Sequence, residues 1–367
     1  LKTRTAIAGK EEIRNSLPVG SSLYWFSKEV EENGYYWKGK PEVVKGDITK
    51  IKGPLVVELF SGCGGTSLGF EEAGFGIAVA VDIHKPSIET FKMNHPNSSV
   101  ILGDIKKISP NLVRELLGGR RVDVLIAGVP CQGFSLNNRK RYKDDKRNFL
   151  YKEFIKYIEI LDPKTAVLEN VSGMISTANG SFVEEIEKEI SKAGHMEVAS
   201  QLLYAPDYGV PQKRRRLVFV GIKGYKFSFD KDMIKTHGPG TKNKYVTIKQ
   251  AIGDLPSLKT GEEAFEYKQP PFSKYQKEMR KDAPKLTCHK APNHPENTIK
   301  KIKETKPGDP LYNKFKQRIR LSWDDLSPTQ VSGGIRPQFQ FAHPEDVRGL
   351  TIRERCRIQS FPDNFVI

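Results

Sequence analysis

The sequence predicts an α/β fold with a doubly wound, mostly parallel Rossmann-like sheet. Three observations predict it: short apolar runs alternate with helical stretches from Leu55 to about Ile222, a Gly-rich turn follows the first run, and acidic residues end the next two. Such alternation is typical of βαβ units, whose ligands bind at the carboxyl ends of the strands. The runs are LVVELF (55–60), IAVAVD (77–82), VILGD (100–104), VDVLIAG (122–128), TAVLEN (165–170) and RLVFVGI (216–222).

The charge of the chain is strongly positive and unevenly distributed. The 367 residues include 60 Lys and Arg against 44 Asp and Glu, a formal net charge of +16. Residues 221–320 hold 23 of these cations and 11 of the anions, a net of +12. A well-solvated surface is one explanation, but basic residues interspersed with aromatic ones fit a folded nucleic-acid surface. The aromatic residues are Tyr245, Phe265, Tyr267, Phe272, Tyr275, Tyr312 and Phe315.

The cysteines and the hydropathy exclude several classes of protein. Cys63, Cys131, Cys288 and Cys356 are far apart and form no CxxC pair, so we expect no structural metal and no disulfide framework. No apolar run approaches the roughly 18 to 20 residues that span a bilayer, and the first 30 residues lack a signal-peptide pattern. We therefore expect a reducing, cytoplasmic location without membrane contact.

The first candidate site is the turn after the first apolar run, in ELFSGCGGTSLGF (58–70). Gly62, Gly64 and Gly65 let the backbone pass close to a ligand, and a helix start offers unpaired N–H groups. Ser67 stands where a dinucleotide fingerprint needs Gly, which disfavours NAD. A tight structural turn explains the glycines equally well.

Two carboxylates strengthen the nucleotide interpretation. Asp82 ends the second run, where an acid can accept hydrogen bonds from ribose hydroxyls, and Asp104 ends the third, where it can meet an adenine edge. Each alone is as well explained as a helix cap or a turn residue. Together with the turn they predict an adenosine site.

The later runs end in candidate catalytic residues. Cys131 follows Pro130 in GVPCQGFS (128–135), where it is either an inert buried thiol or an activated nucleophile. Glu169, in ENV, ends the following run, and a partly desolvated carboxyl group there can donate a proton. The basic run 214–216 can hold phosphate or a polar base edge, or be a solvated face.

These motifs together resemble the DNA (cytosine-5)-methyltransferase family. The resemblance is carried, in order, by ELFSGCGG, GVPCQGFS, ENV, QKRRR and RGLTIRERCRIQSFPD, and it extends from about residue 54 to the C-terminus. It implies the fold of S-adenosylmethionine-dependent methyltransferases. It also implies that the chain transfers a methyl group from S-adenosyl-L-methionine to cytosine C5, releases S-adenosyl-L-homocysteine and needs no metal.

The resemblance assigns roles to individual residues. It implies that the Cys131 thiolate adds to C6 of a flipped-out cytosine and that Glu169 contacts N3 and the exocyclic amine. Arg216 is expected near the cytosine O2, and Arg214 orients neighbouring groups. The implied cofactor-binding residues are Phe60, Ser61, Gly62, Cys63, Gly64, Asp82, Ile83, Asp104, Ile105, Pro130 and Leu150.

It also implies a domain order and a partner. We expect an N-terminal extension of open role (1–52), a catalytic domain (53–222), a target-recognition domain (223–342) and a segment that returns to the catalytic domain (343–367). The basic segment then binds double-stranded DNA. A cognate restriction endonuclease is the expected functional companion.

One motif of the family is absent. Members normally end with a Gly-Asn motif beside the cofactor, whereas this chain stops at FPDNFVI and contains no Gly-Asn pair. We expect a further C-terminal tail to supply it rather than a second polypeptide. Two alternatives to the DNA methyltransferase stay open: a tRNA cytosine-5 methyltransferase of the same superfamily, whose Cys-Phe-Thr signature this sequence lacks, and a catalytically impaired DNA-binding regulator.

Overall fold

The computed structural model describes residues 36–130, 150–175, 181–313, 316–330 and 341–367. The chain divides into two compact units. The first comprises residues 1–201 and 217–232, and the second comprises residues 202–216 and 233–367.

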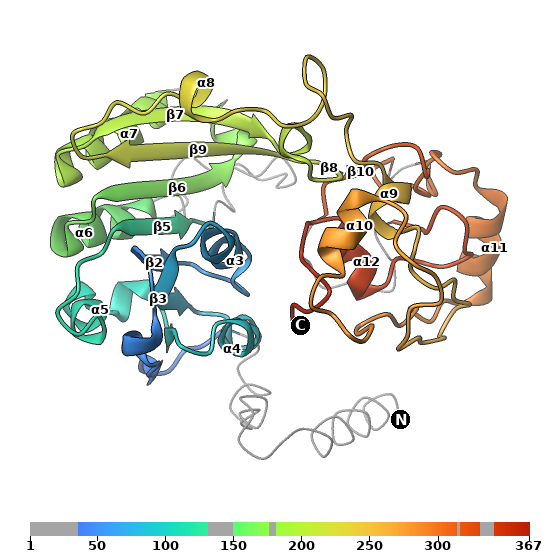
Figure 1. The fold of residues 1–367 in the computed structure, drawn as a ribbon, viewed down its shortest axis with the longest axis horizontal. Coiled ribbons are helices and arrows are strands. Elements are labelled where there is room, and N and C mark those ends of the chain that lie inside the picture. Colours follow the sequence, from blue (N-terminus) through green and yellow to red (C-terminus); the bar gives the residue numbers. More distant parts are fainter. Residues whose placement is uncertain (1–35, 131–149, 176–180, 314–315, 331–340) are drawn as a thin grey trace. The chain divides into compact units, whose positions relative to one another are not determined.

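An eight-stranded sheet organises the first unit, in the order β1-β4-β3-β2-β5-β6-β9-β7 (Figure 1). The pairs β2 with β3, β2 with β5, β3 with β4, and β5 with β6 are parallel, and β1 pairs antiparallel to β4. The predicted mostly parallel α/β fold is therefore confirmed. The strands are β1 (Glu42–Val44), β2 (Leu55–Leu59), β3 (Gly76–Asp82), β4 (Ser99–Leu102), β5 (Val124–Gly128), β6 (Thr165–Val171), β7 (Glu197–Tyr204) and β9 (Arg215–Ile222).

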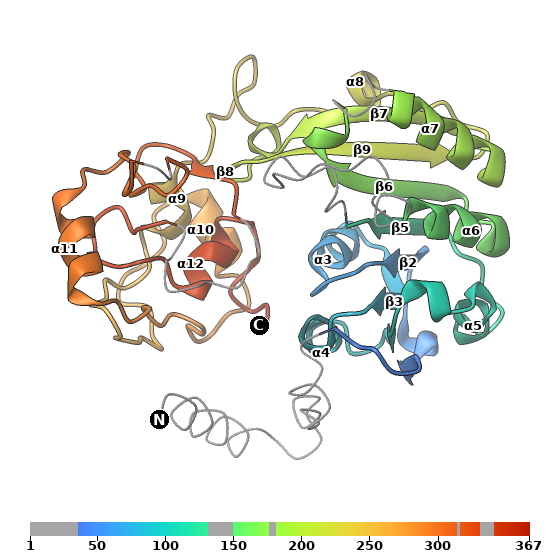
Figure 2. The ribbon, with the colours of Figure 1, turned by 180° about the vertical axis from the view of Figure 1, so that it is seen from behind.

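Helices connect these strands. In Figures 1 and 2, α5, α6 and α7 lie side by side, while α3 and α4 pack on β2, β3 and β4. Helix α6 buries one stripe, because Phe154, Tyr157, Ile158 and Leu161 recur at helical spacing. The helices of this unit are α3 (Gly65–Glu72), α4 (Lys85–Asn94), α5 (Pro110–Leu116), α6 (Tyr151–Leu161), α7 (Ser181–Gly194) and α8 (Phe229–Asp232), with 3₁₀ turns η2 (Ile48–Lys50), η3 (Ile105–Lys107) and η5 (Ser172–Met174).

The core of the first unit lies on the central strands. Every residue of β2 is buried, which agrees with a parallel strand covered on both faces. The buried cluster that joins the strands to α4 consists of Val56, Ile77, Ala80, Ile88, Phe91, Val100, Leu102, Val124 and Ile126.

The second unit is built from short helices and loops. Threonine and serine side chains begin three of its helices with reciprocal capping boxes, at Thr247, Ser273 and Thr351. Its elements are η7 (Ala205–Tyr208), β8 (Gln212–Lys213), α9 (Ile248–Ile252), α10 (Lys274–Met279), α11 (Glu296–Glu304), β10 (Ser327–Pro328) and α12 (Ile352–Arg357), and β8 pairs parallel to β10.

The boundaries of the units differ from the expected ones. Residues 223–232, expected in the target-recognition domain, belong to the first unit. Residues 343–367, expected to return to the catalytic domain, belong to the second unit, because Leu350 and Ile358 complete its core beside Ile248 and Leu286. Residues 202–216 also belong there, because β8 pairs with β10. Within residues 343–367, residues Ile352–Arg357 form helix α12.

Three arginines lie fully buried in this unit. Arg348, Arg353 and Arg357 are each 0% exposed. Arg348 donates from Nη2 to Glu354 Oε1 at 2.7 Å and from Nη1 to Oε2 at 2.9 Å. Burial alone would raise the pKa of Glu354, but the neighbouring Arg348 and His343 hold it at about 2. The closing motif of the sequence is therefore an internal ion-pair network that fixes the second unit.

Within the part of the chain that the structure describes, no helix has both the length and the apolar character needed to cross a bilayer.

Candidate active site

The predicted site residues of the first unit gather at the carboxyl edge of its sheet. The β2 ladders place Leu59 opposite both Val81 and Ala127. The β5–β6 ladder places Gly128 opposite Glu169. Four neighbouring strands thus end together, and the cofactor-binding and catalytic candidates follow these ends.

The turn after β2 has a tightly specified backbone. Phe60 (φ 57°), Gly62 (φ 54°) and Gly64 (φ 89°) all adopt left-handed conformations. The Ser61 N–H donates to the Val81 carbonyl at 3.0 Å, and the Gly64 N–H donates back to Ser61 at 3.1 Å. The turn is therefore held against β3 before α3 begins at Gly65.

Asp82 fastens the same turn with its side chain. Its Oδ2 accepts from the Gly62 N–H at 2.8 Å and its Oδ1 from the His84 N–H at 2.7 Å. Burial raises the pKa of this carboxyl, while the backbone hydrogen bonds act in the opposite direction. Each oxygen retains further acceptor capacity, so the carboxylate can shape the turn and accept a ribose hydroxyl.

Asp104 caps the short helix η3. Its side chain accepts from the Lys106 N–H at 3.1 Å, and the neighbouring Ile105 is buried. The Gly103 N–H donates to the Asp82 carbonyl at 2.9 Å, which joins the ends of β3 and β4. The cap interpretation of Asp104 is thus observed, and Ile83, which follows Asp82, is half-buried.

Two further side chains of the turn bear on a ligand. The Ser61 hydroxyl is buried and has no hydrogen-bond partner, which fits a polar ligand that supplies one. Burial raises the pKa of the Cys63 thiol, and Glu58 and Asp82 raise it further, so Cys63 is protonated rather than nucleophilic. The Asp82 carboxylate and the unsatisfied Ser61 hydroxyl fit an adenosyl ligand.

The sequence analysis missed a buried pair behind the turn. Glu58 is 2% exposed and Ser67 is 0% exposed, and the Ser67 hydroxyl donates to Glu58 Oε2. Burial raises the pKa of Glu58 to about 7, against the hydrogen bonds from Ser67 and Thr66. A charged residue inside the apolar run LVVELF was the available signal, because such a residue needs a buried partner.

Glu169 and Asn170 lie at the end of β6. A Cβ at Gly128 would be 3.7 Å from Glu169 Oε2 and 3.9 Å from the Phe60 carbonyl oxygen, so the bare glycine leaves space beside the carboxylate. Asn170 is 1% exposed; its Oδ1 accepts from the Val171 N–H, and its Nδ2 has no partner.

The remaining predicted residues of this edge differ in their exposure, and one of them is not described by the structure. Pro130 is exposed at the end of the described β5 segment, and Leu150 is half-buried at the N-cap of α6. Cys131, the predicted nucleophile, lies outside the described residues.

The arginines of the basic run lie in the second unit. Arg214 and Arg216 are half-buried; the Arg214 carbonyl accepts from the Ala205 N–H, and Arg216 Nη1 donates to the Arg215 carbonyl at 2.8 Å. The guanidinium of the exposed Arg215 stacks 4.8 Å from the centre of the Tyr204 ring.

The described residues contain no group of three or more His, Cys, Asp or Glu side chains arranged to hold a metal ion.

The family follows from comparison with known proteins. The family model for C-5 cytosine-specific DNA methylase matches residues 55–367. The chain belongs to this family. The resemblance stated from the motifs is confirmed, and the enzyme class is DNA cytosine-5 methyltransferase.

Curated relatives cover most of the chain. The Type II methyltransferase M.DdeI of Desulfomicrobium norvegicum is 33% identical over 333 residues, which is 85% of this chain and 79% of that protein. The Type II methyltransferase M1.HphI of Haemophilus parahaemolyticus is 33% identical over 349 residues, which is 90% of this chain and 85% of that protein.

Solved structures agree on the fold. A prophage-encoded Escherichia coli protein described as a DNA modification methyltransferase superposes with a TM-score of 0.71 at 26% identity, covering 86% of this chain and 90% of that one. The Dnmt2 methyltransferase of S. pombe superposes with a TM-score of 0.55 at 15% identity, covering 86% and 89%, and shows likeness of fold alone.

Proposed function

We propose that this DNA cytosine-5 methyltransferase is the modification enzyme of a restriction-modification system and methylates one cytosine within a specific duplex sequence. The observation that carries the proposal is the pairing of Gly128 with Glu169. It brings Glu169 beside strand β5, which leads into the motif GVPCQGFS that contains Cys131. The turn held by Asp82 ends at the same sheet edge. A proton donor and a cofactor turn at the ends of neighbouring strands, with the predicted nucleophile three residues after Gly128 in the sequence, suit methyl transfer to a base.

The cofactor residues in this proposal are those of the turn and of the next strand ends. Ser61 offers a hydroxyl, Gly62 leaves open space where a side chain would stand, Gly64 holds the turn, and Asp82 offers a carboxylate. S-adenosyl-L-methionine supplies an electrophilic methyl group and leaves as S-adenosyl-L-homocysteine. The remaining candidate cofactor contacts are Phe60, Cys63, Ile83, Asp104, Ile105, Pro130 and Leu150.

The chemistry on cytosine belongs to this chain's own side chains. The Cys131 thiolate forms a C–S bond to C6, and Glu169 holds a proton at N3, which moves electron density onto C5. After C5 is methylated, loss of its proton to a base expels the thiolate and restores the aromatic ring. Arg216 and Arg214 steady the O2 side of the base. The base must leave the duplex to reach these groups.

The two units divide the work in this proposal. The first unit, with the sheet, is the catalytic domain. The second unit contains most of the basic segment 221–320 and is the target-recognition domain, in which Lys and Arg neutralise phosphates and a few side chains read bases. Relatives named as Type II methyltransferases support a role in protecting DNA from a cognate endonuclease.

The direct test is methyl transfer to duplex DNA and to tRNA in parallel, followed by bisulfite sequencing of the DNA. We expect 5-methylcytosine at one position of a short recurring DNA sequence and no transfer to tRNA. Methylation of tRNA alone would replace the substrate with that of the tRNA-modifying branch. Specific DNA binding without methyl transfer would indicate a regulator that retains only the fold.

A further inference from the structure

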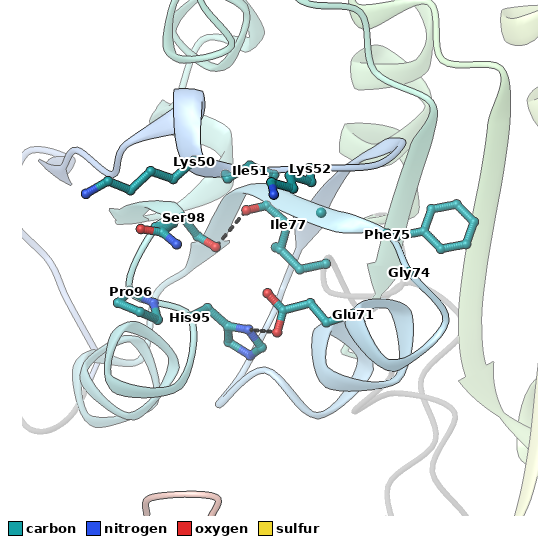
Figure 3. A pocket seen from close by; sticks show the side chains of 12 residues that line it. Lys50, Ile51, Lys52, Glu71, Gly74, Phe75, Ile77, His95, Pro96 and Ser98 are labelled. Atoms are coloured by element: carbon teal, nitrogen blue, oxygen red, sulfur yellow. Dashed lines mark hydrogen bonds and ion pairs between the residues drawn. The ribbon is translucent and has the colours of Figure 1, made fainter.

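A buried histidine packs directly beneath the glycine turn. His95 ends α4, and its side chain is 0% exposed. Its Nδ1 lies 2.8 Å from Glu71 Oε2, and its Nε2 lies 3.3 Å from the Gly64 carbonyl oxygen. Figure 3 shows His95 and Glu71 joined on the wall of a pocket of about 350 Å³. The ring therefore links the two ends of α3.

Both neighbours of this ring are acceptors. The Gly64 carbonyl can only accept a hydrogen bond, so the ring N–H at Nε2 is the donor of that contact, while Nδ1 faces the Glu71 carboxylate. The geometry thus suits a ring that is polarised by Glu71 and donates to Gly64.

The His95 ring fits against the turn only because residue 64 has no side chain. A Cβ there would lie 2.6 Å from His95 Nε2 and 2.8 Å from Phe91 Cδ2. The His95 ring also packs on Phe91, with 4.4 Å between ring centres. Glycine at position 64 therefore provides both the left-handed backbone and the slot for the imidazole.

The Gly64 carbonyl, which accepts from His95, also starts helix α3. Gly64 O also receives the first helical hydrogen bond, from the Leu68 N–H at 2.9 Å, and the Gly64 N–H closes the turn onto Ser61. A second donor on Gly64 O fixes the peptide plane between Gly64 and Gly65. The orientation of that plane sets the direction of the Gly65 N–H and the start of α3.

We propose that His95, oriented by Glu71, is a positioning residue that holds the Gly64 carbonyl and keeps turn 61–64 in its cofactor-binding form. This inference rests on the proposed function, because it assumes that the turn binds the adenosyl cofactor. His95 acts through Gly64 and touches neither cofactor nor base.

The test separates binding from chemistry. His95→Phe keeps a ring on Phe91 but has no donor, and we expect its KM for S-adenosylmethionine and its Kd for S-adenosylhomocysteine to rise about 10-fold, the effect of losing one hydrogen bond of roughly 1.4 kcal/mol. At saturating cofactor, kcat stays within about twofold of the wild type. His95→Gln, whose amide can donate to Gly64, recovers most of the affinity.

Two further variants test the proposal even if His95→Phe does not fold. Glu71→Ala changes a partly exposed side chain and leaves the ring in place, and we expect KM to rise about threefold because the ring loses its orienting partner. In His95→Ala, added imidazole restores affinity, since His95 lines a pocket of about 350 Å³ that can admit it. His195→Phe, at an exposed position of the same unit, is the matched control and leaves both constants unchanged.

The possible results separate the positioning role of His95 from the methyltransferase function itself. Wild-type affinity in a folded His95→Phe, or a fall in kcat with unchanged KM, would overturn the positioning role while leaving the methyltransferase intact. If His95→Phe does not fold, unchanged KM in Glu71→Ala and no imidazole rescue of His95→Ala would overturn it. Wild-type protein that neither binds S-adenosylhomocysteine nor methylates DNA would overturn the proposed function and this inference together.

Discussion

Glu169 stands opposite Gly128 in the parallel ladder of β5 and β6, and its Oε2 is 3.7 Å from the position that a Cβ of Gly128 would take. The glycine keeps the space beside the carboxylate open. The strand of Gly128 leads directly into the motif that contains Cys131. One register relationship thereby connects the two residues on which the proposed chemistry depends.

Replacing Glu169 by Gln should remove catalysis and preserve the fold. The amide cannot release a proton to N3, so we expect the single-turnover rate of DNA methylation to fall by about 10² to 10⁴. The midpoint of thermal unfolding should change little, because the site is at a strand end. Glu197→Gln, exposed at the start of β7, is the control and should keep full activity. A Glu169→Gln enzyme with wild-type rate would remove Glu169 from the mechanism.

The buried Glu58 should make stability fall as pH rises. Its pKa is raised from 4.5 to about 7 in the folded chain, so the folded state holds the proton more tightly than the unfolded state. The stabilisation is fully present below pH 4.5 and is lost as pH rises toward 7, by up to about 3 kcal/mol.

Urea unfolding of the wild type and Glu58→Gln at pH 5 and pH 8 measures this effect. Glu58→Gln removes the titrating group and keeps a polar partner for Ser67. We expect the difference in unfolding free energy between the two proteins to change with pH in the variant's favour at pH 8. An equal difference at both pH values would mean that Glu58 does not titrate in this range.

The second unit should depend on Arg357. Its guanidinium donates to Asp363 at 2.9 and 2.6 Å and also to Asp254, and all three side chains are 0% exposed. Arg357→Leu leaves two carboxylates buried without this partner, so we expect a loss of roughly 3 to 5 kcal/mol in unfolding free energy. Lys274→Ala, which breaks the exposed pair with Glu278, should cost less than about 1 kcal/mol. Equal effects of the two variants would contradict the network's role.

The basic segment should give DNA binding a steep salt dependence. If it makes about six phosphate contacts, affinity falls by roughly 10³ between 50 and 200 mM salt. Lys242 and Lys244 are exposed, and replacing both by Ala should lower the slope of log K against log salt by about two. Lys192→Ala, exposed on α7, should leave the slope unchanged. A flat salt dependence in the wild type would make the segment a solvated surface.

The central strands could be predicted from the sequence because both of their faces are buried. LVVEL and GIAVAV read as continuous apolar runs, and the acids that end runs, such as Asp82, marked the ligand edge. Strand β7 was not predicted, because EVASQLLY mixes polar and apolar residues and none of its residues is fully buried. Strand β1, of three residues, is too short to produce a pattern.

Contacts between distant residues explain the rest. His95 contacts Gly64, which is 31 residues away in the sequence, and Arg357 contacts Asp254, which is 103 residues away. No local sequence pattern predicts either pair. Residues 343–367 belong to the second unit for the same reason, because Leu350 and Ile358 pack on a core formed by residues distant in sequence. The assignment of Cys131 stays a prediction from its motif.

The central claim is a covalent bond between Cys131 and cytosine C6, and a duplex containing 5-fluorocytosine at the methylated position tests it most directly. Fluorine at C5 cannot leave as a proton does, so the enzyme, the base and the transferred methyl group remain joined. With S-adenosylmethionine present, we expect a denaturation-resistant protein–DNA adduct in the wild type and none in Cys131→Ser. An adduct that persists in Cys131→Ser would contradict the account.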